Sequence, residues 1–149
     1  MSSAEVVQIL TLARSKVENR WVQNKAYDSY GGVCMGHALD TSLSELLRVG
    51  ITMEDRQHAC DTVVRMIQRR YGHHWRSIPE WNDSPTRTKG QVLAIFDEAI
   101  ALVESMIPPE VEVVEKVVVP RVHTVVIPPP APEEAPKSIL DRVKDLVGV

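Results

Sequence analysis

The sequence predicts an all-α fold: a compact bundle of about four helices, followed by a proline- and valine-rich extended tail that ends in a short amphipathic helix. Apolar residues recur at helical spacing in four segments before residue 107. All seven aromatic residues precede Ile107, whereas eight of the ten prolines lie at or after Pro108. Because aromatic side chains supply much of a core's apolar area and prolines remove backbone donors, the helical domain is expected to end near Pro108.

The size and composition fit one soluble globular domain with an appendage. The chain has 149 residues, of which 44% are hydrophobic and 25% charged, as is ordinary for globular proteins. About a hundred residues are enough to bury a core without disulfides or metals. We therefore expect a helical domain at 1–107, an extended tail or linker at 108–137, and an amphipathic helix at 138–149.

The first half of the domain is expected to hold two helices joined by a loop. The first helix is predicted over about 3–20, with Ser3 as its cap, from five apolar residues at helical spacing: Val6, Ile9, Leu10, Ala13 and Val17. The stretch "WVQNKAYDSYGG" lacks that period, so it is expected to be a loop with a short extended piece around 21–23. The second helix is predicted over about 33–49 and is stopped by Gly50.

The second half is expected to hold two more helices. The third begins after Thr52, where "TMED" resembles a capping box with Asp55 in place of Glu, and it ends at Gly72. Its apolar face is predicted to be Cys60, Val63, Val64, Ile67 and Tyr71. The stretch "HHWRSIPEWNDSPT" is expected to be irregular, with Asp83 or Ser84 bonding to free amides before the next helix. The apolar face of the fourth helix is Val92, Ile95, Phe96, Ala99, Ile100, Val103 and Met106.

The tail has two unlike parts. "VEVVEKVVVPRVHTVVI" is rich in β-branched residues, which favour extended structure, and 128–130 are prolines typical of a polyproline spacer. "SILDRVKDLVGV" places its apolar residues on one helical face, with Ser138 as the cap. Such a short helix is not stable alone in water, so it needs a surface to pack on.

"GGVCMGHAL" places a thiol and an imidazole, Cys34 and His37, three residues apart at the start of the second helix. They are candidate catalytic residues, because a helix N-terminus lowers a thiol's pKa and a histidine can activate it. They are also half of a metal site if His58 and Cys60 supply the rest, but residues two apart on a helix point to different sides, so no metal site is predicted. The favoured interpretation is packing, in which the small residues Cys34, Gly36 and Ala38 let the bulky Trp21 cross the helix.

Other charged residues are explained by helix structure. Arg69, Arg70 and His73 are candidate anion-binding residues, although cations near a helix C-terminus also complement its dipole. Four carboxylates are further candidates for catalytic groups, but nothing in the sequence places two of them together, so they are interpreted as lying on solvated helix faces: Asp40, Glu45, Asp97 and Glu98.

Two stretches, "WVQNKAYDSYGGVCMGHAL" and "WNDSPTRTKGQVLAIFDEAIA", resemble an uncharacterised domain of unknown function found in actinobacteria and their phages. The resemblance covers about residues 4–106 and excludes the tail. In that family's pattern a glycine is expected where His37 stands, which counts against shared Cys-His chemistry. The resemblance implies an α-helical domain and a phage or actinobacterial source, and it supplies no activity.

These observations predict a non-enzymatic protein-interaction protein, an accessory or structural component encoded by a phage. It is expected to need no cofactor and to dock through its tail on a host or virion protein, or on a second copy. The residues expected to bind the partner are apolar side chains of the tail: Val113, Val117, Val119, Val125, Ile127, Ile139, Leu140, Val143, Leu146 and Val147.

Two alternatives stay open: a small enzyme with Cys34 as nucleophile, and a nucleic-acid-binding regulator that uses the surface of 65–76. The net charge of −3 lacks the basic footprint that nucleic-acid binding normally leaves. With two cysteines, no signal peptide and no apolar run of membrane length, the chain is expected in the host cytoplasm or in the virion.

Overall fold

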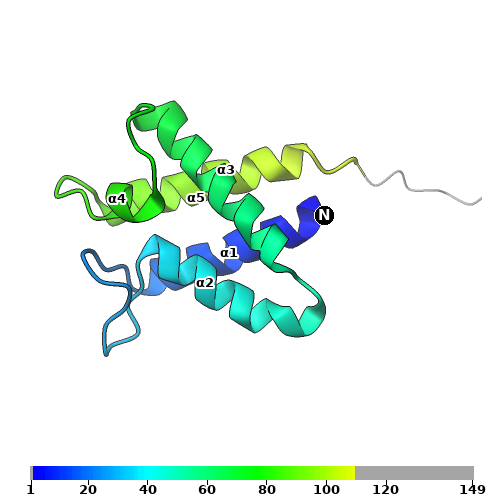
Figure 1. Cartoon of the computed structure of the whole chain (residues 1–149), viewed down its shortest axis with the longest axis horizontal. Coiled ribbons are helices and arrows are strands. Elements are labelled where there is room, and N and C mark those ends of the chain that lie inside the picture. Colours follow the sequence, from blue (N-terminus) through cyan, green and yellow to red (C-terminus); the bar gives the residue numbers. More distant parts are fainter. Residues whose placement is uncertain (1, 110–149) are drawn as a thin grey trace, which may run out of the picture. The chain divides into compact units, whose positions relative to one another are not determined.

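Five α-helices and one short 3₁₀-helix make up most of the residues that the structure describes, which confirms the predicted all-α class (Figure 1). The structure is a computed structural model and describes residues 2–109. In chain order the elements are α1 (Ser3–Asn19), α2 (Met35–Leu46), η1 (Leu47–Val49), α3 (Met53–Tyr71), α4 (Ile78–Asn82) and α5 (Lys89–Ser105). The chain divides into two units, Met1–Val111 and Glu112–Val149, and the predictions for the tail lie outside the described residues.

α1 is the centre of the helical unit, because it packs against α2, α3 and α5. In Figure 1, α2 and α5 run back along α1, and α3 crosses them obliquely. The predicted apolar face of α1 is fully buried, together with large side chains from the other helices such as Leu39, Trp81 and Phe96. None of the helices within residues 2–109 is both long enough and apolar enough to cross a membrane.

The caps explain where the first two helices begin. The Ser2 side chain accepts a hydrogen bond from the Ala4 amide at 3.3 Å, so Ser2 and not the predicted Ser3 is the cap of α1. α2 begins at Met35, two residues later than predicted. The reason is that Val33 is held in the preceding loop: its amide donates to the Arg20 carbonyl at 2.9 Å and its carbonyl accepts from the Val22 amide at 3.1 Å.

The beginning of α3 is as predicted. Thr52 and Asp55 form a complete capping box, and Gly72 follows the last residue of the helix. The buried face is rotated slightly from the predicted one. Ala59, Val63, Met66 and Ile67 are buried, whereas Cys60, Val64 and Tyr71 lie partly exposed at the edge of the core.

The segment predicted to be irregular contains a helix, α4, of five residues. Ser77 caps it and Pro79 lies in its first turn, where a missing backbone donor costs nothing. Its Trp81 and Asn82 are completely buried. The cap of α5 lies further along the chain than Asp83 and Ser84, because Thr88 and Gln91 form its capping box.

Candidate functional site

The two candidate catalytic residues, Cys34 and His37, lie together at the start of α2. Cys34 is the N-cap, and its Sγ accepts a hydrogen bond from the His37 backbone amide at 3.4 Å. The His37 ring instead packs against Tyr27, with ring centroids 5.0 Å apart. Within residues 2–109 no hydrogen bond joins the thiol to the imidazole. A base activates a thiol by accepting its proton through such a bond, so this geometry is that of a helix cap.

Close packing against a glycine does occur, but at Gly32 and not at the predicted Gly36. A Cβ built on Gly36 would have its nearest contact at 4.0 Å, so nothing bulky crosses α2 there. A Cβ on Gly32 would lie 2.6 Å from Val22 Cγ1 and 2.9 Å from Asp28 Oδ1. The Gly32 amide donates to that same carboxylate oxygen at 2.7 Å, which lowers the pKa of Asp28. The crowded glycine therefore packs against side chains of its own loop, the one between α1 and α2, and not against a segment that crosses α2.

Asn82 joins this loop to the beginning of α2. Its side-chain oxygen accepts from Trp21 Nε1 at 2.8 Å and from the Met35 amide at 3.2 Å. Its amide nitrogen donates to the Val22 carbonyl at 3.3 Å and to Asp83 Oδ1 at 2.8 Å. All the hydrogen-bonding positions of a completely buried side chain thus face protein groups, which is the arrangement that a buried amide requires.

Further hydrogen bonds link the same two loops. Gln23 Nε2 donates to the carbonyls of Asn82 and Ser84, both at 2.9 Å. Asp83 Oδ1 accepts from the Asn24 amide at 2.8 Å. Asp83 does bond to an amide, as predicted, but that amide belongs to the first loop and not to the next helix. The polar residues of the two motif stretches therefore hold the fold together.

Arg87 lies in an aromatic cluster that includes Trp81, the residue before Asn82 in the chain. Its guanidinium carbon is 3.8 Å from the ring centroid of Trp81, 4.7 Å from that of Tyr71 and 5.6 Å from that of Trp75. Its Nε donates to the Trp81 carbonyl at 3.1 Å, and burial lowers its pKa. No carboxylate pairs with it among residues 2–109. Since aromatic faces attract cations and Arg87 is 7% exposed, it acts here as a buried packing element.

The four carboxylates considered as catalytic groups each pair with a base from another helix. The pairs are Asp40–Arg56, Glu45–Lys16, Asp97–Arg14 and Glu98–Arg70. The four carboxylates are 40–57% exposed, so they lie on solvated helix faces as expected, and each forms an ion pair with a neighbouring helix there. No three metal-ligating side chains come together within the described residues. Burial raises the pKa of the Cys60 thiol, which keeps it protonated.

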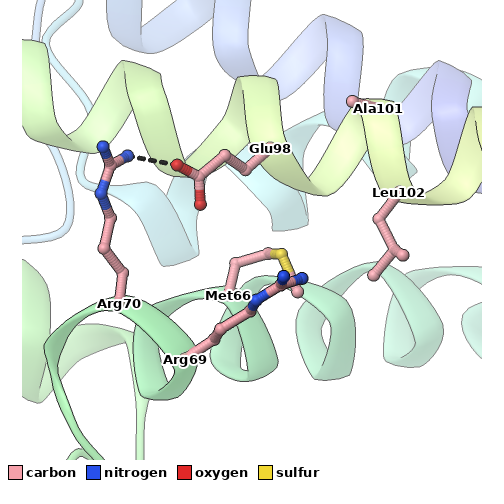
Figure 2. A pocket seen from close by; sticks show the side chains of 6 residues that line it. All are labelled: Met66, Arg69, Arg70, Glu98, Ala101 and Leu102. Atoms are coloured by element: carbon pink, nitrogen blue, oxygen red, sulfur yellow. Dashed lines mark hydrogen bonds and ion pairs between the residues drawn. The ribbon is translucent and has the colours of Figure 1, made fainter.

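The structure brings two of the three candidate anion-binding residues to one cleft. This cleft lies between α3 and α5, has a volume of about 480 Å³, and is lined by Met66, Arg69, Arg70, Glu98, Ala101 and Leu102 (Figure 2). Arg70 forms an ion pair with Glu98. His73 is not among the lining residues.

One end of the helical unit exposes large apolar side chains. Of the seven exposed ones within residues 2–109, five come from η1, the start of α3 and the end of α5: Leu47, Val49, Met53, Met106 and Ile107. The first turn of α1 lies beside both groups, since Ser2 and Glu5 line a pocket with Gly50 and Thr52, while Ser3 and Val6 line one with Val103 and Met106. We call these five residues the apolar end.

Comparison with protein families gives one match that covers residues 1–102, a family of unknown function (DUF6197). The chain belongs to this family. Comparison with curated proteins and with solved structures gives no match. The match confirms that the chain resembles a domain of unknown function, and in this DUF6197 chain it spans α1 to most of α5, including both motif stretches.

Several residues that shape this DUF6197 domain were not predicted from the sequence. The capping box at Thr88 and Gln91 was readable as a Thr-x-x-Gln pattern. The junction at Asn82 and the stacking of Arg87 had no local signal, since their partners lie far away in the chain. The apolar end was also hidden, because exposed and buried apolar residues look alike in a sequence.

Proposed function

We propose that this protein is a non-enzymatic interaction protein that binds a protein partner through its C-terminal tail, aided by the apolar end. One observation carries the proposal. The apolar end exposes Val49, Met53 and Met106 by 70%, 63% and 56%, and it includes the last turn before the tail. Contiguous exposed apolar patches mark interaction surfaces, and the proposal takes the two groups that flank the first turn of α1 as parts of one such surface.

The chemistry of the motif residues supports the same proposal. Cys34 serves as a helix cap, Asn82 has its polar atoms bonded to protein groups, and Arg70 is paired with Glu98. The Cys34 enzyme needs the capping thiol free to react, and the nucleic-acid regulator has Arg70 removed from the cations of 65–76 by that ion pair. A small, rigid helical domain that presents an apolar end needs none of them.

The tail supplies the contact in this proposal. Its valine segments would add as strands to a sheet edge, and the apolar residues of 138–149 would lie in a groove on the partner. A source among actinobacterial phages, and a place in the host cytoplasm or virion, belong to the proposal as well. The partner is then a host or virion protein, and self-association through the tail is its variant.

Affinity capture from extract of the presumed host tests the proposal. Full-length protein, a deletion of 108–149, and the full-length variants Met53→Glu and Tyr30→Glu would be compared by quantitative mass spectrometry. Tyr30 is the matched control, because it is 79% exposed and lies outside the apolar end. Circular dichroism would establish that each form is folded, as expected since the core lies within residues 6–103.

We expect the deletion to lose the partner and Met53→Glu to weaken its capture, with Tyr30→Glu unchanged. Undiminished capture by the deleted form would refute a role for the tail. Equal losses from Met53→Glu and Tyr30→Glu would refute a role for the apolar end. Binding to nucleic acid that weakens steeply with salt would favour the regulator instead.

A further inference from the structure

The cleft between α3 and α5 combines one uncompensated positive charge with an apolar wall. Arg70 reaches across to Glu98 and forms an ion pair with it (Figure 2). Arg69 is exposed and has no hydrogen-bonded or ionic partner among residues 2–109. The cleft therefore carries an excess positive charge, which favours a negatively charged group on whatever binds there.

The apolar part of the cleft is formed by both helices. Met66 is buried, Leu102 is partly buried and Ala101 is exposed. On α3 the spacing from Met66 to Arg70 is four residues, and on α5 the spacing from Glu98 to Leu102 is also four. Each wall is thus about one helical turn long, roughly 6 Å. A ligand that fits both walls carries one apolar side chain and one carboxylate about a turn apart.

We propose that this cleft binds an acidic amphipathic helix of a protein partner, with an apolar side chain between Met66 and Leu102 and a carboxylate on Arg69. A helix that presents a residue and its fourth neighbour on one face supplies this pair. None of the residues that line this cleft belongs to the tail or to the apolar end. The proposed function and this inference can therefore fail independently.

The probe is a fluorescent alanine-based peptide of about fifteen residues, the length at which isolated helices become stable. It carries leucine and glutamate four residues apart, and a matched peptide has lysine in place of each glutamate. Fluorescence anisotropy with the full chain measures both, at two salt concentrations. The variants are Arg69→Glu, Ala101→Glu and the control Arg48→Glu, which makes the same charge change at an exposed site in η1.

We expect the acidic peptide to bind more tightly than the lysine peptide, and both cleft variants to weaken it by about five- to tenfold. Arg48→Glu should change its dissociation constant by about twofold or less, because remote charges are screened. Thermal melts followed by circular dichroism check folding, and Ala101→Glu, at an exposed helical position, provides a test if Arg69→Glu fails to fold.

Three results would overturn the proposal. The first is equal weakening by Arg69→Glu and Arg48→Glu, which would show that only net charge matters. The second is a dimer, seen by light scattering, that Arg69→Glu abolishes, because a second copy would then occupy the cleft. The third is displacement of the peptide by a single-stranded oligonucleotide that binds more tightly and loses affinity with Arg69→Glu.

Discussion

Replacing Asn82 by alanine is expected to destabilise the domain more than any exposed substitution. The change removes the acceptor of the Trp21 indole and of the Met35 amide, and the donor to the Val22 carbonyl. The Met35 amide is buried in the core, so it cannot form a hydrogen bond with water instead. The Trp21 indole is only partly buried, so solvent can replace part of that bond.

The magnitude follows from the groups left without partners. A buried polar group that loses its hydrogen bond costs about 1–3 kcal/mol, so the two donors and the carbonyl together give a loss of about 3–5 kcal/mol. Small domains have a free energy of unfolding of about 5–15 kcal/mol, so Asn82→Ala should leave the protein marginally stable. Trp21→Phe removes only one donor and should cost less.

Urea denaturation followed by far-ultraviolet circular dichroism measures this loss, and an unchanged m-value would show that two-state unfolding is preserved. Asn19→Ala, at the exposed end of α1, is the matched control and should change stability by about 0.5 kcal/mol or less. Asn82→Asp tests the hydrogen bonds of the Asn82 side chain while keeping a side chain of nearly the same size and shape. It places a new carboxylate against Asp83, so its cost relative to the parent should shrink as pH falls and the carboxyl group introduced at position 82 becomes protonated.

A decrease in the free energy of unfolding below about 1 kcal/mol for Asn82→Ala would refute the reasoning. It would show that the Trp21 indole, the Met35 amide and the Val22 carbonyl find other hydrogen-bond partners. Full additivity of Trp21→Phe and Asn82→Ala would refute it as well. Residues that share a hydrogen bond show a coupling of about 0.5–3 kcal/mol in a double-mutant cycle.

Three further predictions concern the caps and the loop. Gly32→Ala should cost about 1–3 kcal/mol, because its Cβ meets Val22 and Asp28, whereas Gly36→Ala should be neutral or stabilising by up to about 1 kcal/mol; thermal melts that move in the same direction would contradict this. Cys34→Ser should keep the cap and the stability, and Cys34→Ala should lose about 0.5–2 kcal/mol; an alanine variant as stable as the parent would show that Sγ does not cap α2. Hydrogen bonds from Thr52 hold the pKa of Asp55 below its usual value, so its stabilisation is present above about pH 4 and is lost as pH falls through the lower folded pKa. Asp55→Asn should cost about 1–3 kcal/mol at neutral pH and less in acid, and a pH-independent difference in urea midpoints would rule out the charge as the cause.

The sequence by itself determined the all-α class, the capping box that begins α3 and the core face of α1. These features are set by near neighbours along the chain: apolar residues at helical spacing, a threonine three residues before an acid, and a glycine that ends a helix. The sequence did not reveal α4, because five residues are too few for a helical period to show. It also placed the crowded glycine wrongly, at Gly36 instead of Gly32.

Tertiary structure decided what the candidate site residues do. Whether Cys34 meets an imidazole or a backbone amide depends on how the loop before α2 is held, and Asn82 holds that loop from 61 residues away along the chain. The cleft between α3 and α5 likewise depends on how two helices pack, which brings Arg69 and Leu102 into the lining of one cleft. Contacts of this kind pair residues that carry no local signal for each other, so only the folded chain shows which polar groups are used internally and which still face a partner.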